Sequence, residues 1–302
     1  MEYLSTTAAV KANRNYKDTL FRLLFRDAEQ LLQLYNAVNG THYVNAEDLK
    51  VVTLENAVYM NMKNDLAFVM DFYLNLYEHQ STFNPNMPLR DLFYVAREYQ
   101  NLIEDESLYS STLIRIPTPR FVVFYNGVEE QRERIELRLS DAYEQKTDAP
   151  EMELKVLMLN INCGHNKELL AQCRLLQEYM LYVECVRTYA RKMKLDEAVE
   201  RAVDECIQKG ILREFLSRYR SEAIAVSIFE YDEEREKEKL RRAEYKAGEE
   251  QGSRSERERF RQLSVKLQES SRIEDLLRAT TDFEYRDALY REYEIQETIN
   301  VR

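Results

Sequence analysis

Glycine and cysteine are scarce in this chain of 302 residues, and tryptophan is absent. With only 6 glycines, the chain has no glycine-rich loop of the kind that cradles nucleotide phosphates, which disfavours nucleotide-dependent mechanisms. The 4 cysteines lie ten or more residues apart and no Cys-x-x-Cys occurs, so no Cys/His set has the spacing of a zinc site. We therefore expect reduced, mostly buried thiols in a cytoplasmic protein.

Long apolar runs and an excess of positive charge are also missing. No run of about 18 apolar residues occurs, so we expect no membrane-spanning segment, and the first residues lack the basic and apolar regions of a secretory signal. The net charge of −11 argues against a protein that coats nucleic acid by bulk attraction. A function on nucleic acid would need a local basic strip or a metal ion to offset the phosphate charge.

The most informative stretch spans residues 64–80, which reads as two adjacent short strands. Side chains alternate between the faces of a strand, so Glu78 and Gln80 leave the sheet on the same face and His79 on the other. If Asp71-Phe72 forms the turn, Asp65 becomes a near neighbour of Glu78. Two carboxylates and an amide carbonyl would then meet at one end of a hairpin, and such oxygen ligands suit hard divalent cations.

An Asp, a short hairpin and Glu-x-Gln, followed by His-Gln-Ser-Thr (79–82) and Asn-Met-Pro-Leu-Arg (86–90), resemble the PD-(D/E)XK nucleases. The similarity is to the Rpn (recombination-promoting nuclease) or transposase-like branch. It covers most of residues 10–170 and continues more weakly to the end. It implies a restriction-endonuclease-like α/β fold, with a mixed central sheet flanked by helices, and a Mg²⁺-dependent DNA endonuclease in which Mn²⁺ can substitute.

The resemblance also assigns roles to individual residues. Asp65 and Glu78 would hold the metal ion, with Asp18 as a further ligand from a helix; the alternative for Asp18 is an aspartate favoured near a helix N-terminus. Gln80 stands where the superfamily often has lysine. An amide can position water by hydrogen bonding but cannot act as a base. The plain alternative for Asp65 and Glu78 is structural, at a turn and on an edge strand.

Three basic residues are candidates for DNA binding. Arg90 and Arg97 lie seven residues apart on one face of a helix expected from about residue 88 to 102, where they could hold phosphates. Lys63, just before Asp65, could supply from another direction the positive charge that Gln80 lacks. The alternative in each case is a solvated surface side chain. For His79 we expect packing or hydrogen bonding rather than metal ligation.

The remaining pattern divides the chain into four parts. Residues 10–166 form the nuclease-like domain, with helices over 15–25 and 27–40, strands near 49–60, 120–125 and 154–161, and a charged linking segment up to 151. A helical annex, 167–230, is followed by a charged helical linker, 231–259. The segment 260–302 contains two capping boxes, Ser271 with Glu274 and Thr281 with Glu284, which open short helices. These C-terminal helices could dock on the annex or join a homo-oligomer.

A rival function remains open beside DNA cleavage. The net negative charge of the chain, and glutamine rather than lysine at position 80, favour a catalytically weak or inactive nuclease fold. Such a protein would serve as an oligomeric binding or regulatory module.

Overall fold

The structure is a computed structural model that describes residues 20–52, 65–104 and 106–295. The chain divides into two compact units, Met1–Glu234 and Arg235–Arg302. The first unit is a mixed α/β layer fold, as predicted. Among the described residues, no helix combines the length and the apolar character that crossing a membrane requires.

Six strands form one mixed sheet in the first unit, in the order β1-β2-β3-β4-β6-β5. β3 runs parallel to β4, and β4 parallel to β6, whereas the other neighbouring pairs are antiparallel. The strands are β1 (Lys50–Val51), β2 (Leu66–Met70), β3 (Tyr73–Gln80), β4 (Thr118–Tyr125), β5 (Arg134–Arg138) and β6 (Lys155–Asn160). The strands predicted at 66–80, 120–125 and 154–161 are present; of the strand predicted near 49–60, β1 covers Lys50–Val51, and residues 53–60 lie outside the described residues. β5 was missed, because this short strand lies in the segment predicted to be a linker.

The central hairpin has the predicted turn. Leu66 pairs with Tyr77 and Met70 with Tyr73, so Asp71 and Phe72 form a two-residue loop. Both loop residues have positive φ, 49° and 63°, as the tightest hairpin turns require. Neither is glycine, so the turn carries steric strain at Phe72 in particular.

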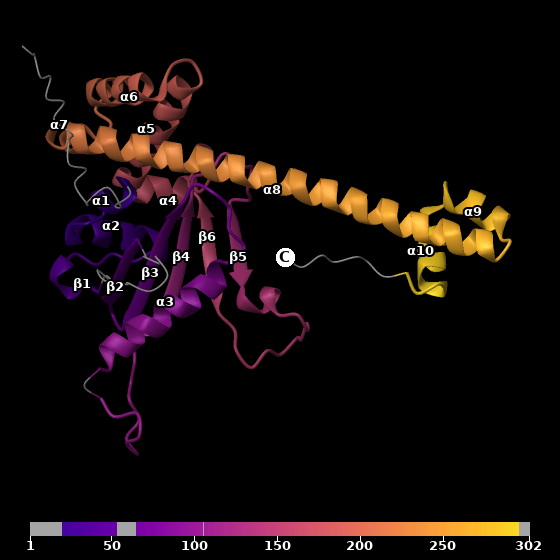
Figure 1. Cartoon of the computed structure of the whole chain (residues 1–302). Coiled ribbons are helices and arrows are strands. Elements are labelled where there is room, and N and C mark those ends of the chain that lie inside the picture. Colours follow the sequence, from indigo (N-terminus) through magenta and orange to yellow (C-terminus); the bar gives the residue numbers. More distant parts are fainter. Residues whose placement is uncertain (1–19, 53–64, 105, 296–302) are drawn as a thin grey trace, which may run out of the picture. The chain divides into compact units, whose positions relative to one another are not determined.

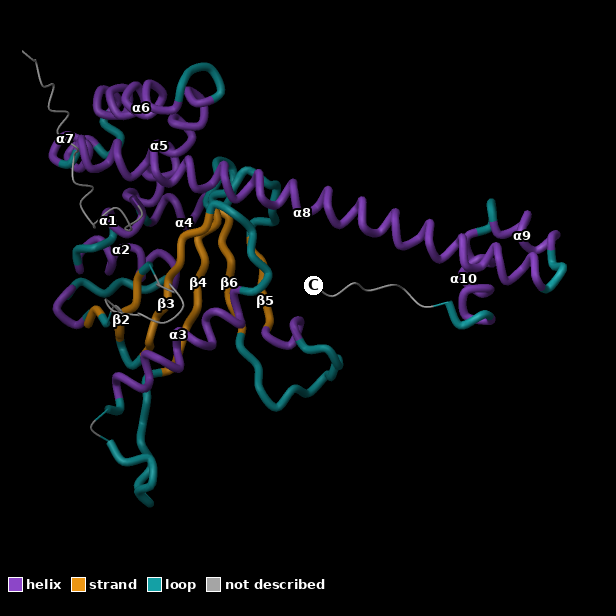
Figure 2. Tube along the Cα trace, in the orientation of Figure 1, coloured by secondary structure: helices purple, strands orange, loops and turns teal. Residues whose placement is uncertain are grey.

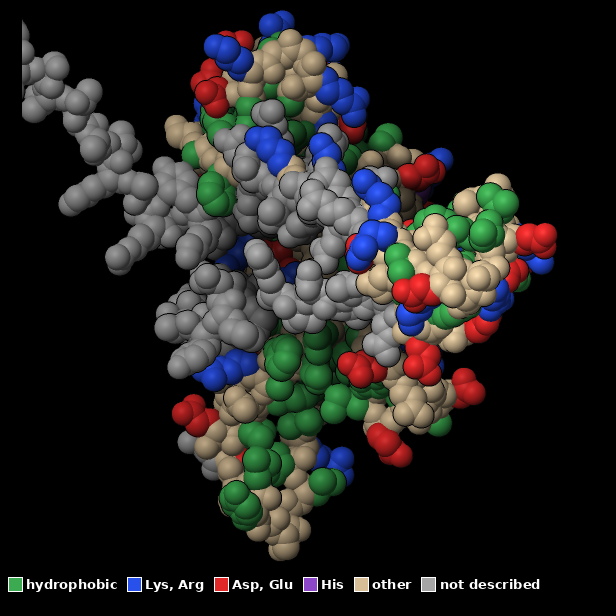
Figure 3. Space-filling view, turned by 45° about the vertical axis from the view of Figure 1, so that its right-hand side comes forward, with side chains coloured by type: hydrophobic (Ala, Val, Ile, Leu, Met, Phe, Trp, Pro, Cys, Tyr) green, Lys and Arg blue, Asp and Glu red, His purple; other side chains and the backbone are tan. Residues whose placement is uncertain are grey.

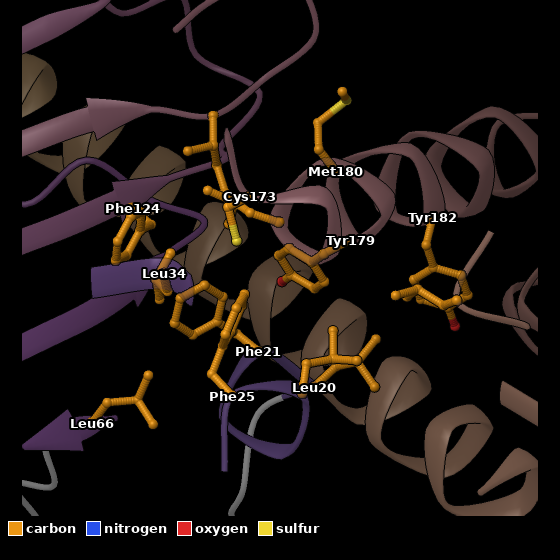
Figure 4. Close-up of a cluster of buried hydrophobic side chains, with 14 of the residues drawn as sticks. Leu20, Phe21, Phe25, Leu34, Leu66, Phe124, Cys173, Tyr179, Met180 and Tyr182 are labelled. Carbon is orange, nitrogen blue, oxygen red and sulfur yellow. The ribbon is translucent and has the colours of Figure 1, made fainter. Parts of the chain in front are cut away.

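Helices cover both faces of the sheet (Figure 1). One face packs against α1 (Leu20–Leu24), α2 (Ala28–Asn39), α4 (Lys167–Gln172) and α5 (Arg174–Ala190). Figure 4 shows part of this core, where Phe21 and Phe25 lie near Phe124 and Tyr179. The opposite face packs against α3 (Met87–Leu102) through a second cluster that includes Leu74, Leu76, Tyr94 and Val95. As predicted, side chains of residues 66–80 alternate between the two faces of the sheet. Leu66, Phe68 and Met70 pack in the first core, and Leu74 and Leu76 pack in the second.

Residues 167–230 are largely helical, as predicted for the annex. α4 ends at Cys173, and α5 begins directly after it. α6 (Leu195–Lys209) ends at Gly210, and α7 (Arg213–Arg218) follows. The next helix, α8 (Arg220–Glu269), continues through the charged linker as one element of 50 residues, including both of its glycines. Side chains of opposite charge at helical spacing favour a helix in this segment.

The second unit contains the end of α8 with α9 (Ile273–Ala279) and α10 (Phe283–Glu292) around a small core of Leu263, Leu267, Ala279, Leu289 and Tyr290. Both predicted capping boxes are wrong in their cap residue. Arg272, not Ser271, precedes α9, and Asp282, not Thr281, caps α10 by accepting a hydrogen bond from the Tyr285 N–H. Aspartate caps a helix N-terminus at least as well as threonine, and Asp282 directly follows Thr281, so α10 begins after Asp282 rather than after Thr281.

The sheet has distinct ends and edges. Two short 3-10 helices, η1 (Ala46–Asp48) and η2 (Leu139–Ala142), accompany its outer strands. Figure 2 shows the long loops that precede β4 and β6 at one end, opposite the end where β3, β4 and β6 finish. At the edges, β1 has only two residues and β5 exposes Arg134, Glu136 and Arg138.

Candidate functional site

The hairpin register brings Asp65 opposite Glu78. Leu66 pairs with Tyr77, so the next position on each strand places these two acids side by side, just beyond the last β2–β3 pair. Both lie on the face that α3 covers, near the carboxyl end of β3. The Asp65 carboxylate accepts a hydrogen bond from the His79 backbone N–H, 2.8 Å away, and so fastens the end of the hairpin. In open α/β sheets this end of the parallel strands is where ligands commonly bind.

Glu78 is buried, with 6% of its surface exposed, and its charge is matched by Arg90. The Arg90 Nη2 atom lies 3.3 Å from Glu78 Oε1 and donates a hydrogen bond to the Tyr94 hydroxyl at 2.9 Å. Arg90 comes from the first turns of α3, whose residue Met87 places its sulfur 3.4 Å from Arg90 Nη1. The first turns of α3 therefore supply both the counterion and its support.

Burial raises the pKa values of two acids at the site. Burial raises the pKa of Glu78 well above its ordinary value, and the neighbouring Asp65 raises it further, whereas Arg90 opposes the shift. Burial also raises the pKa of Asp91 to about 8. A cation that binds here must therefore compete with protons as well as with the Arg90 guanidinium.

Two acidic residues of α3 were missed from the sequence. Asp91 and Glu98 are only 2% and 3% exposed, and each has a carboxylate oxygen without a hydrogen-bond partner among the described residues. Burial raises the pKa of Glu98 to about 7. Asp91 and Glu98 lie seven residues apart, which places them on the same face of α3 as the buried Tyr94 and Val95. Helical periodicity in the sequence could therefore have predicted that they are buried. Asp91 contributes to the field at Glu78.

The other predicted site residues are dispersed. Gln80 is half-buried on the face of Glu78, with its Nε2 2.6 Å from the Met87 sulfur. Arg97 is exposed, but the outer face of α3 also exposes Leu89 and Phe93, and Figure 3 shows hydrophobic side chains gathered over this part of the unit. α3 therefore presents no continuous basic strip. Lys63 and Asp18 lie outside the described residues.

His79 packs in the opposite core, which confirms the expectation from strand alternation. Its ring stacks on Phe21 with centroids 5.2 Å apart, and its Nε2 lies 3.0 Å from the Tyr179 hydroxyl. Burial lowers the pKa of His79 to about 3, so the imidazole is neutral at physiological pH. His79 supports the site through its backbone N–H rather than through its ring.

A magnesium ion fits the donor set only in part. Within the described ranges, no group of three or more His, Cys, Asp and Glu side chains could hold a metal ion. Mg²⁺ often takes one or two protein carboxylates and keeps several waters, so Asp65 and Glu78 on one face meet its minimum need. Arg90 contacts Glu78 Oε1, so a cation that binds this oxygen would compete with the guanidinium for it.

Comparison with protein-family models, with curated proteins and with solved structures finds no match to this chain. Function must therefore be inferred from the site. The distribution of charge also bears on the function. Residues 235–302 carry 16 basic and 16 acidic side chains, so their charges cancel, and the net charge of −11 lies entirely in the first unit, which contains the candidate site.

Proposed function

We propose that the first unit is a divalent-cation-dependent DNA endonuclease of the PD-(D/E)XK type, in its Rpn or transposase-like branch. The observation that supports this most strongly is the pairing of Asp65 with Glu78 on one face at the carboxyl end of β3, with Gln80 two residues further on the same face. The sequence motif and the hairpin register both support this choice of residues.

Each residue has a distinct task in this proposal. A bound Mg²⁺ would act as a Lewis acid on the phosphate and lower the pKa of a bound water. Asp65 and Glu78 would hold the ion, and the His79 N–H, which donates to the Asp65 carboxylate, would orient that carboxylate. Gln80 positions the attacking water through its amide and takes no proton, so the rate depends on the ion for nucleophile activation.

The test is cleavage of plasmid and of single-stranded DNA with and without Mg²⁺ or Mn²⁺. Asp65→Asn and Glu78→Gln preserve shape and remove charge, so we expect each to lower metal-dependent nicking by at least about 100-fold, as for loss of a principal electrostatic group. Glu136→Gln, which changes an exposed acid on β5, is the matched control and should cleave normally. Undiminished cleavage by both site variants would refute the assignment.

A second candidate function is a binding or regulatory module that retains the fold without catalysis. The ion pair between Arg90 and Glu78 favours it, because this pair neutralises the site without a metal ion. The net negative charge of the same unit also disfavours a nucleic-acid partner. Titration with Mn²⁺, followed by electron paramagnetic resonance of the free ion, separates the two functions: binding that Glu78→Gln abolishes supports the nuclease, and no binding at millimolar Mn²⁺ supports the module.

A further inference from the structure

Glu78 has one cationic partner among the described residues, the Arg90 guanidinium. A carboxylate this deeply buried is costly without compensation, so the partner stabilises the charged form of Glu78 in the absence of a metal ion. The guanidinium therefore occupies one of the positions from which a divalent cation would reach the same oxygen.

The contact is built in a way that allows exchange. One nitrogen meets one oxygen at 3.3 Å, rather than two parallel hydrogen bonds, and the Arg90 side chain is 33% exposed. The same nitrogen also donates a hydrogen bond to the Tyr94 hydroxyl. Because Met87, Tyr94 and Val95 bury the inner face of α3, the helix is fixed, and rotation of the long arginine side chain is the movement with the lowest cost.

We propose that Arg90 is a built-in counterion of Glu78 that a divalent cation displaces, and that the displaced guanidinium then binds a phosphate of the nucleic-acid substrate. Loading of the cation would thus deliver a phosphate-binding group to the site, and without the cation the site stays neutral and closed to phosphate. This inference rests on the proposed nuclease function, and it assigns Arg90 two successive partners.

Arginine modification with phenylglyoxal, read residue by residue with mass spectrometry, follows this exchange without any cleavage assay. In the full chain without metal, Arg90 should react slowly. Saturating Mg²⁺ should raise its rate on the order of fivefold, as expected for release of one partly exposed, charge-assisted hydrogen bond. Arg97, an exposed arginine of the same helix, is the internal control and should react equally with and without Mg²⁺. Addition of a short oligonucleotide with Ca²⁺ should protect Arg90 again.

Glu78→Gln gives a second, independent readout. This variant removes the charge that holds the guanidinium, so Arg90 should react rapidly with or without Mg²⁺. If Arg90 stays as protected in Glu78→Gln as in the native chain, Glu78 is not what holds it and the proposal fails. If Mn²⁺ binds in the resonance titration but Mg²⁺ leaves the Arg90 rate unchanged, the exchange is refuted while the nuclease function survives. If no cation binds, both are refuted.

Discussion

The buried carboxyl group of Asp91 makes the stability of the first unit depend on pH in a direction opposite to that of ordinary acid denaturation. Burial raises its pKa from 3.8 to about 8, so the folded protein keeps a proton that the unfolded chain loses above pH 4. The free energy of unfolding is therefore not reduced by Asp91 below pH 3.8, and it falls as the pH rises from 3.8 toward 8. We expect Asp91→Asn, which cannot ionise, to remove this loss.

The magnitude follows from linkage. Each pH unit between the two pKa values costs about 1.4 kcal/mol, so the interval from pH 6.5 to 8 should cost the native protein about 2 kcal/mol through Asp91. The interval is chosen because of His79. With a pKa lowered to about 3, His79 gives the opposite slope below pH 6.5, where the unfolded chain gains its proton, and a small residual slope above it that the native protein and Asp91→Asn share.

Urea unfolding followed by circular dichroism and tyrosine fluorescence, which suits a chain with 21 tyrosines and no tryptophan, measures the free energy at each pH. The native protein should lose about 2 kcal/mol more than Asp91→Asn between pH 6.5 and 8. Asp141→Asn, at an exposed position in η2, is the control and should keep the native slope. Equal slopes for the native protein and Asp91→Asn would show that Asp91 is not held in its neutral form.

Two further predictions concern backbone geometry. Phe72 has a positive φ of 63° and 85% of its surface is exposed. Phe72→Gly should therefore relieve backbone strain without loss of core contacts and raise the free energy of unfolding in urea by about 1 kcal/mol. A less stable variant would contradict the strained turn. A Cβ at Gly127 would collide with the Ser81 carbonyl oxygen and the Tyr125 ring, so Gly127→Ala should cost about 3 kcal/mol. Gly40→Ala, where a Cβ meets open space at a left-handed position, should cost only about 1 kcal/mol, and equal melting temperatures for the two variants would refute the collision.

The parts of the fold that sequence predicted are those with a strong local period. Alternation over residues 66–80 gave the hairpin, its turn and the common face of Glu78 and Gln80, because strand geometry leaves no other arrangement. β5 was not predicted, because Arg-Ile-Glu-Leu-Arg contains only two apolar residues. It lies at the edge of the sheet, where a strand needs fewer buried apolar side chains.

The proximity of Asp65 to Glu78 was predictable from the sequence, and the surroundings of this pair were less so. A motif names Asp65 and Glu78, but the direction of Arg90 depends on how α3 packs across the sheet, which no local pattern encodes. Asp91 and Glu98 were overlooked because acidic residues are seldom buried without partners, so the usual preference argues against the positions they occupy.

The border formed by β5 limits how the first unit meets an extended peptide. Along β5 the exposed charges of Arg134, Glu136 and Arg138 alternate with two apolar residues, and these charges disfavour pairing with an incoming apolar strand. Recruitment of a partner strand by β-augmentation is thereby discouraged at this border, and so is cross-β growth from it.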